Sequence, residues 1–244
     1  MAATDVIYAK AFFDLQFDCA EIVSRRSGLD LPSALFEYTN FYIRFGQGRS
    51  FDPTRAAWQE YLAGLRGADD GREWTYRFYR SRPHDPGAPA VVATSGCFSY
   101  ARLDDDRIRL HFLNAETDGH SPLAKDRRDQ RVAELTALFN HVKDTVQHPV
   151  RVIGGSWLYN LEAYRRLFPP RYIASARAVP PRFRHMPLWG QFVDRHGEVK
   201  EMAARQFRDR LGRLSDVEGL GRCFPFPVIA VEASVLDFYE CYGL

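Results

Sequence analysis

The stretch Val150–Asn160, with the sequence VRVIGGSWLYN, joins a short apolar run to a helical pattern through two glycines and a serine. Adjacent glycines weaken a strand, and they are retained where the chain bulges or where another backbone or a ligand must come close. We therefore expect Gly154, Gly155 and Ser156 to lie beside a bound ligand.

Ser156 also has a second interpretation. A serine on a sharp turn between a strand and a helix is the nucleophile of many hydrolases, within the pattern G-x-S-x-G. Leu158 occupies the position of the second glycine, which the tight turn requires. A serine hydrolase is therefore an alternative that the pattern disfavours.

Histidines and carboxylates gather after another apolar run. His111, Glu116, Asp118 and His120 carry atoms that bind transition metals, so a metal-dependent hydrolase is a further alternative. A calcium loop beginning at Asn114 is excluded, because its twelfth position holds a lysine instead of the bidentate glutamate. We expect an ordinary polar loop and no bound metal.

Composition narrows the class of protein. Of the 244 residues, 45% are hydrophobic and 14% are aromatic, which is enough for a sizeable core. The formal net charge of +2 gives no electrostatic basis for binding nucleic acid or a membrane surface. No signal-peptide pattern, spanning apolar run or C-x-x-C pair is present. We expect a cytoplasmic protein that binds a small-molecule substrate.

The first 66 residues form an N-terminal helical region, predicted to pack on a core of residues 67–244. Asp30 and Pro32 suit the first turn of a helix. Apolar residues at three- and four-residue steps predict helices at 5–26, 30–45 and 52–65. This region would form either the acceptor-side wall of a binding site or a homodimer interface.

After residue 66 the apolar residues first recur at every second position, as in strands. Helical and extended patterns then alternate along the rest of the chain. Three extended segments predict a meander, at 73–80, 90–102 and 108–113. The later elements are a helix at 121–146, a strand at 150–158, a short helix at 161–168, an extended piece at 171–179, a hairpin at 188–200 around the turn Asp194–Gly197, a helix at 201–213 and a strand at 228–232. The predicted class is α+β, with N-terminal helices followed by a mixed, mainly antiparallel sheet flanked by helices.

This order of elements resembles the GNAT acyltransferase fold over roughly residues 70–200. The segments that carry the likeness are Leu110–Asn114 (LHFLN), Gly155–Leu158 (GSWL) and Tyr164–Pro169 (YRRLFP). They are similar to a group of GNAT-like domains in which an LHIP strand precedes a helix, an SWLL strand and a short helix. The resemblance implies an acyltransferase that uses acyl-CoA and modifies an amine or alcohol.

The resemblance also implies where acyl-CoA binds. In GNAT proteins the fourth and fifth core strands separate, the freed backbone groups bind the pantetheine arm, and the pyrophosphate lies at the start of the next helix. Here the corresponding ligand-binding residues are Gly119, Ser121 and Arg127 before or within the helix, and Gly154, Gly155 and Ser156 at the strand end. The usual glycine-rich pyrophosphate loop is absent, and only Gly119 remains of it.

The candidate catalytic residues follow from the same resemblance. His111 is the preferred general base, because histidine titrates near neutral pH, and Glu116 is the second choice. The tyrosine acid of the family falls at Leu167, so Tyr164 or Tyr159 would have to substitute for it, and Tyr164 is the proposed residue. A non-catalytic binding or regulatory protein on the same scaffold is the alternative that these departures favour.

Overall fold

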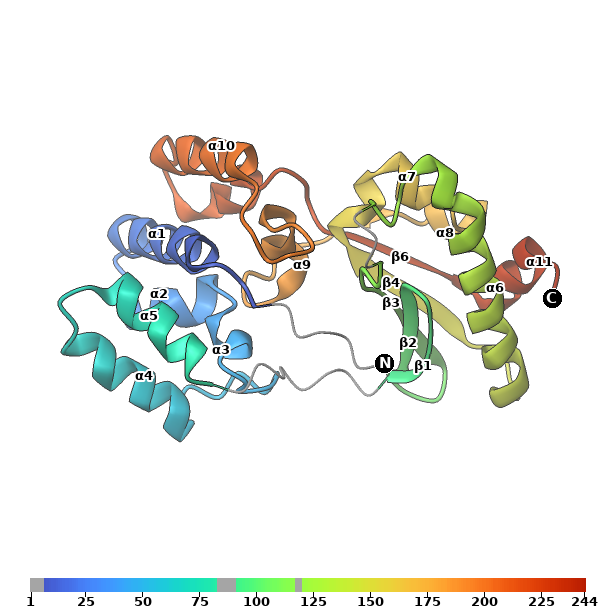
Figure 1. The fold of residues 1–244 in the computed structure, drawn as a ribbon, viewed down its shortest axis with the longest axis horizontal. Coiled ribbons are helices and arrows are strands. Elements are labelled where there is room, and N and C mark those ends of the chain that lie inside the picture. The colour runs from blue at the N-terminus through green and yellow to red at the C-terminus, as the bar shows by residue number, and fades with distance from the viewer. Residues whose placement is uncertain (1–6, 83–90, 117–119) are drawn as a thin grey trace. The chain divides into compact units, whose positions relative to one another are not determined.

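The computed structural model describes residues 7–82, 91–116 and 120–244 (Figure 1). The chain divides into two compact units, and each is built from segments distant in sequence. The first contains Met1–Ala88 and Pro180–Pro227, and the second contains Pro89–Val179 and Val228–Leu244. The boundary expected at residue 66 falls inside the first unit, because the next helix, Gly71–Arg80, packs against the helices Lys10–Ser27 and Ala56–Arg66. The first unit also takes in Pro180–Pro227 from the predicted core.

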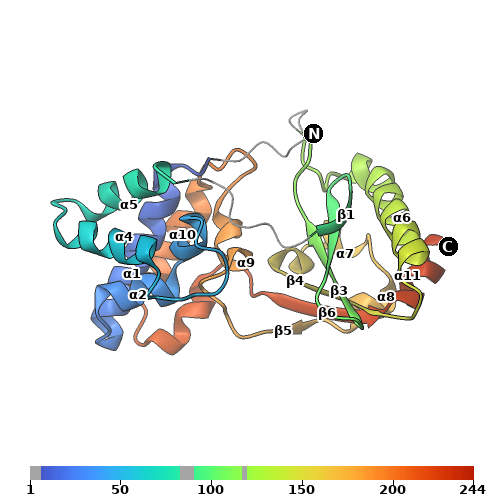
Figure 2. The same ribbon diagram turned by 90° about the horizontal axis from the view of Figure 1, so that it is seen from below.

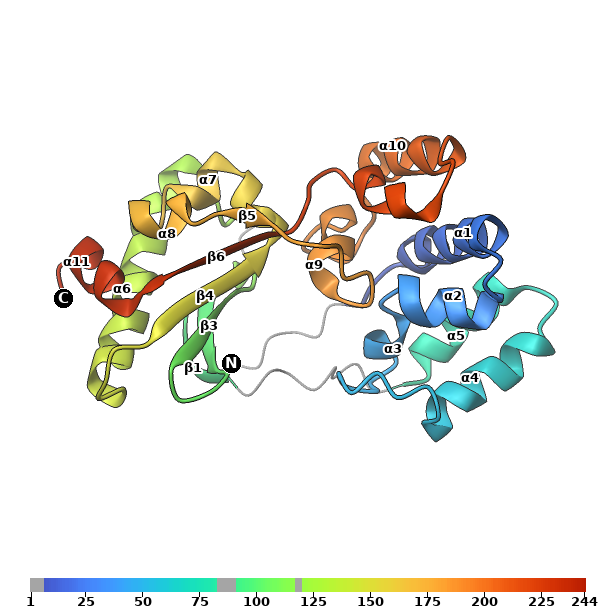
Figure 3. The ribbon, with the colours of Figure 1, turned by 180° about the vertical axis from the view of Figure 1, so that it is seen from behind.

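The first unit is helical. Helix α1 (Lys10–Ser27) packs against α2 (Leu31–Tyr38), α5 (Gly71–Arg80) and α10 (Glu201–Gly212). Figure 3 shows these helices from behind. The remaining helical elements are α3 (Phe41–Arg44), α4 (Ala56–Arg66), α9 (Met186–Trp189) and the 3-10 turns η3 (Gly190–Phe192) and η4 (Val217–Cys223).

Local sequence signals place most of these helices. Asp30 caps α2 by accepting a hydrogen bond from the Ser33 N–H at 2.8 Å, and Pro32 lies in its first turn, as predicted. The helix expected over 30–45 is interrupted between α2 and α3. The Thr39 hydroxyl there donates to the Leu35 carbonyl at 2.6 Å and accepts from the Phe41 N–H at 3.2 Å, so the side chain replaces part of the helical ladder.

The strand predicted at 73–80 is wrong, because this segment forms α5. The Asp70 carboxylate caps its first turn, accepting from the N–H groups of Arg72 and Glu73. Thr75, Phe78 and Tyr79 are buried, at the three- and four-residue spacing of a helix face. The β-forming tendency of the aromatic residues is outweighed by this cap and by burial.

The second unit holds a mixed sheet with the order β1-β2-β3-β4-β6-β5. The strands are β1 (Val91–Ser95), β2 (Phe98–Arg102), β3 (Arg107–Phe112), β4 (Arg151–Ser156), β5 (Arg177–Ala178) and β6 (Ile229–Ser234). Only β3 and β4 pair in parallel among the described strands. Figure 2 shows the sheet from below, with the last strand, β6, between β4 and β5.

Several predicted extended segments differ from the structure. The single strand expected at 90–102 is the hairpin β1–β2, which turns at Gly96 with a φ of 53°. The piece at 171–179 begins within helix α8 (Pro170–Ala174), and only the short β5 in it is extended strand. The hairpin at 188–200 is reduced to one bridge between Val193 and Val199, because α9 and η3 occupy its first arm.

The helices of the second unit bury one face of the sheet. Helix α6 (Arg128–Thr145), preceded by the 3-10 turn η1 (Lys125–Arg127), runs beside the sheet (Figure 1). Its predicted buried stripe joins α7 (Glu162–Arg165), α8 and α11 (Val235–Tyr242), and the inward side chains of the strands, in one apolar cluster. The architecture is therefore α+β with a mixed sheet flanked by helices, as predicted. No described helix is long and apolar enough to cross a membrane.

Candidate functional site

The parallel strands β3 and β4 separate toward their C-terminal ends. Their pairing covers three residue pairs and ends at Arg109–Ile153. Beyond that point β3 continues to Phe112, paired on its other side with β2, and β4 continues to Ser156, paired on its other side with β6. We call the diverging segments Leu110–Phe112 and Gly154–Ser156 the splay.

Main-chain polar groups face the splay from both strands. The Arg151 N–H donates to the Asp106 carbonyl at 2.8 Å, so odd-numbered residues of β4 direct their backbone groups toward β3. The Leu113 N–H donates to the Cys97 carbonyl at 2.9 Å, so even-numbered residues of β3 direct theirs toward β4. The last pair, Arg109–Ile153, uses the Leu110 N–H as the donor to the Ile153 carbonyl, so the Leu110 carbonyl and the backbone groups of Phe112 and Gly155 are those that point into the splay, where an extended ligand could pair with them.

Gly154 makes room for two tyrosines. A Cβ atom at this position would lie 2.2 Å from Tyr159 Oη and 2.4 Å from Tyr172 Oη. The two hydroxyls are 2.9 Å apart and hydrogen-bonded to each other in the buried core. The structure therefore gives Gly154 a packing role on the helix-covered face, and its predicted contact with a ligand stays a prediction.

Gly155 has a different environment. It is exposed, and no described atom lies within 4 Å of a Cβ built there. Its neighbour Ser156 ends the strand, and the Ser156 hydroxyl accepts from the Leu158 N–H at 3.1 Å to cap the 3-10 turn η2 (Trp157–Asn160). Of the two glycines, Gly155 is the one that leaves open space beside the splay.

His111 lies on the same sheet face as Gly155. Arg109 is in register with Ile153, and strand side chains alternate between faces, so His111 and Gly155 both occupy the face opposite the helix-covered one. The His111 side chain is half-buried, and its Nε2 atom is shielded from solvent. The structure therefore brings this candidate base to one edge of the splay.

Tyr164 lies on the opposite face of the sheet. Its ring packs against Phe112 with a centroid distance of 5.4 Å and against Tyr159 at 5.0 Å. Burial, together with the neighbouring Tyr159, raises the pKa of Tyr164 well above its ordinary value. The hydroxyl therefore stays protonated at neutral pH, and the raised pKa makes it a weaker proton donor than an exposed tyrosine. His111 and Tyr164 are placed on the two sides of the splay.

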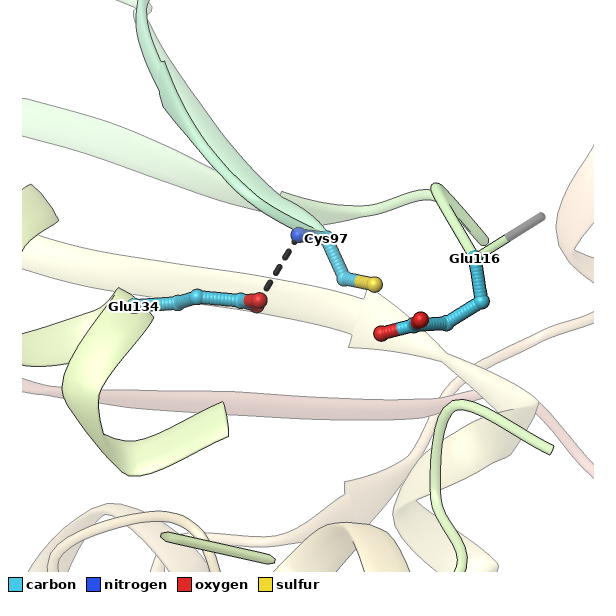
Figure 4. A group of neighbouring side chains, drawn as sticks. All are labelled: Cys97, Glu116 and Glu134. Carbon is cyan, nitrogen blue, oxygen red and sulfur yellow. Dashed lines mark hydrogen bonds between the residues drawn. The ribbon is translucent and has the colours of Figure 1, made fainter. Parts of the chain in front are cut away.

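Glu116 belongs to a buried ionic cluster that the sequence prediction missed (Figure 4). The guanidinium of Arg131, 1% exposed, contacts the Glu116 carboxylate, the Glu134 carboxylate at 2.8 Å, and the thiol of Cys97. Glu134 also accepts from the Cys97 backbone N–H at 2.9 Å. The available signal was Arg131 itself, which precedes Leu135 and Leu138 by four and seven residues and so lies on the buried stripe of α6.

The cluster contains the donor set of a metal site, but an arginine holds it together. The ligand atoms of Cys97, Glu116 and Glu134 lie within 4.8 Å of one another. Arg131 contacts all three residues and offsets one of the two carboxylate charges, so a metal would have to displace a buried guanidinium. The arrangement is explained as an ion-paired anchor between α6 and the ends of β2 and β3. His120, the second histidine of the metal alternative, is exposed.

The start of α6 contains the other predicted ligand-binding residues. The exposed Ser121 hydroxyl accepts from the Leu123 N–H at 3.3 Å, and Arg127 Nη1 lies 3.8 Å from a Glu116 carboxylate oxygen. Asp126 and Asp129 add negative charge to the first turns. Gly119 and Asp118 lie outside the described residues. The predicted pyrophosphate residues therefore already have protein partners or stand among carboxylates.

No protein-family model matches this chain, and no curated protein and no solved structure shows significant similarity to it.

Proposed function

We propose that this protein is an acyltransferase that binds an acyl-CoA thioester in the splay between β3 and β4. The acyl group passes to an amine or alcohol acceptor. The observation that supports the proposal is the end of the parallel pairing at Arg109–Ile153, beyond which both strands continue. The resemblance to the GNAT scaffold leads us to expect such a separation of parallel strands, and the end of the pairing supports the proposal for this reason.

The backbone groups at the splay suit a slender, amide-containing chain. Phe112 and Gly155 offer N–H donors and C=O acceptors, and Leu110 offers its carbonyl, at strand spacing. The pantetheine arm of CoA contains two amides and can pair with them as an added strand would. Gly155 supports this proposal further, because it leaves space beside the ligand path.

The transfer needs a base for the acceptor and a proton for the leaving sulfur. The acceptor nitrogen attacks the thioester carbonyl carbon, the new carbon–nitrogen bond forms and the carbon–sulfur bond breaks. His111 takes the proton from the acceptor on its face of the sheet, the CoA thiolate takes up a proton from solvent, and the His111 imidazolium releases its proton to solvent. Glu116 is the weaker candidate, because its oxygens contact Arg131 and Arg127.

Ligand-dependent stabilisation tests the proposal. Acetyl-CoA or octanoyl-CoA at about 100 times its dissociation constant should stabilise the native state by about 2.7 kcal/mol. For a chain of this length, that free energy raises the melting temperature by roughly 5–10 °C. Gly155→Val should abolish this rise while keeping the unliganded melting temperature, since valine suits a strand and meets no described atom. Absence of a shift with either thioester would contradict the proposal.

A non-catalytic binding protein on the same scaffold is the second candidate. Asp126, Asp129 and the Arg127–Glu116 ion pair at the start of α6 favour it, because they disfavour an added pyrophosphate. His111→Ala separates the candidates. A transferase loses acyl transfer by about 10²–10⁴-fold, the range for general base catalysis, and retains thioester binding. A binding protein shows no turnover to lose.

A further inference from the structure

A basic pocket in the first unit is separate from the splay. It lies where the end of α10 meets η4 and has a volume of about 270 Å³. Three arginines, Arg210, Arg213 and Arg222, line it together with the hydroxyl of Ser215. Leu214 and Cys223 supply buried apolar surface.

The pocket arginines have no carboxylate within salt-bridge distance among the described residues, whereas Arg208 of the same helix is paired with Asp18 at 3.1 Å. The one carboxylate that lines the pocket, Asp216, is engaged locally. It accepts from the Gly219 N–H at 2.9 Å and from the Ser215 hydroxyl at 3.0 Å. These bonds hold the loop and leave a net positive charge of about two around the pocket.

The surrounding backbone positions the guanidinium of Arg210, and all three pocket arginines are exposed residues. Arg210 Nη1 donates to the carbonyls of Cys223 and Phe224, both at 3.3 Å. A Cβ atom at Gly219 would come within 3.2 Å of Arg222 Nη2, so the glycine leaves room for that side chain. The arginines come from two elements of the chain and converge on one depression, which is the arrangement that binds phosphate oxygens by forked hydrogen bonds.

We propose that this pocket binds the phosphoryl or diphosphoryl group of a small soluble ligand. A volume of about 270 Å³ is at or below the lower end of small-molecule sites, roughly 300–1,000 Å³, so it accommodates the phosphate moiety and leaves the remainder of the ligand outside. Because the pocket lies within the first unit, this inference does not rest on the proposed transferase activity. A structural role for the arginines, as positive charges at the end of α10, predicts stability effects without ligand binding.

Calorimetric titration with inorganic pyrophosphate, at constant ionic strength, tests the inference. We expect saturable binding with one site, and ADP should compete with it. The variant Arg213→Gln/Arg222→Gln should weaken binding at least tenfold. It leaves Arg210 and its carbonyl contacts in place, so folding is preserved and is checked by the melting temperature.

Arg205→Gln is the matched control, because Arg205 is an exposed arginine of the same helix outside the pocket. It should change the pyrophosphate affinity by less than twofold. Vesicles that contain phosphatidic acid form the last arm of the experiment. Binding to vesicles without binding to pyrophosphate, equal affinity in the double variant and the native chain, or no saturable binding at all would each overturn the proposal.

Discussion

Gly154 and Gly155 are neighbours in one strand, and the structure predicts opposite consequences when each is replaced by alanine. At Gly154 the new methyl group would lie 2.2 Å and 2.4 Å from the hydroxyls of Tyr159 and Tyr172. At Gly155 it would meet no described atom. The pair therefore compares an overpacked site with an open one in the same element.

The expected magnitudes follow from these contacts. Overpacking a rigid core costs about 1–3 kcal/mol, and breaking the Tyr159–Tyr172 hydrogen bond costs about 1 kcal/mol more. Replacing glycine with alanine stabilises the native state by about 0.4–1 kcal/mol, because it lowers the conformational entropy of the unfolded chain. Gly154→Ala should therefore lower the free energy of unfolding by about 1–4 kcal/mol, and Gly155→Ala should leave it unchanged or raise it by up to about 1 kcal/mol.

Urea unfolding measures the free energy of unfolding of the two variants. Amide hydrogen exchange of peptides from both units shows which unit is destabilised. Adding Tyr159→Phe to Gly154→Ala removes the nearest clashing hydroxyl and should recover part of the loss, seen as a coupling energy in a double-mutant cycle. The reasoning is refuted if both alanine variants unfold within about 0.5 kcal/mol of each other, a difference typical of independent surface changes.

Three further predictions concern other residues. Arg131→Leu leaves the carboxylates of Glu116 and Glu134 without their buried partner, so stability should fall by about 3–5 kcal/mol in urea unfolding, and a loss under about 1 kcal/mol would contradict the ionic anchor. Burial raises the pKa of Tyr164, so its hydroxyl stays protonated in the native state at a pH above about 10, where the unfolded chain loses the proton. The free energy of unfolding should therefore fall as the pH rises past about 10, and Tyr164→Phe should reduce this decrease. Hydrogen bonds from the Glu73 and Arg72 N–H groups lower the pKa of Asp70 in the native state. The ionised Asp70 therefore stabilises the native state above about pH 4, and this stabilisation is lost as the pH falls through the lowered pKa. Asp70→Ala should therefore lower the melting temperature at pH 7, whereas Asp70→Asn should preserve the cap and flatten the dependence on acid; equal melting temperatures for the two variants would contradict the capping role.

Local signals in the sequence determined the helices α1, α6 and α10 and the turn at Asp194–Gly197. In each case a periodic apolar stripe or a short-range hydrogen bond, such as Asp194 accepting from the His196 N–H at 2.7 Å, decides the local structure. The α+β class and the candidate ligand-binding strand end followed from the same signals. The aromatic content of residues 73–80 predicts a strand, but the Asp70 cap and the helical spacing of the buried residues make this segment α5.

Only the tertiary structure decided what the two glycines do. The role of Gly154 depends on Tyr172, which is 18 residues away and reaches it through α8, and the separation at Gly155 depends on where β3 stops pairing with β4. Likewise, the burial of Arg131 requires Cys97 and Glu116 from other elements. These features arise from contacts between distant segments. The residues adjacent in sequence do not specify which distant side chain a residue will contact.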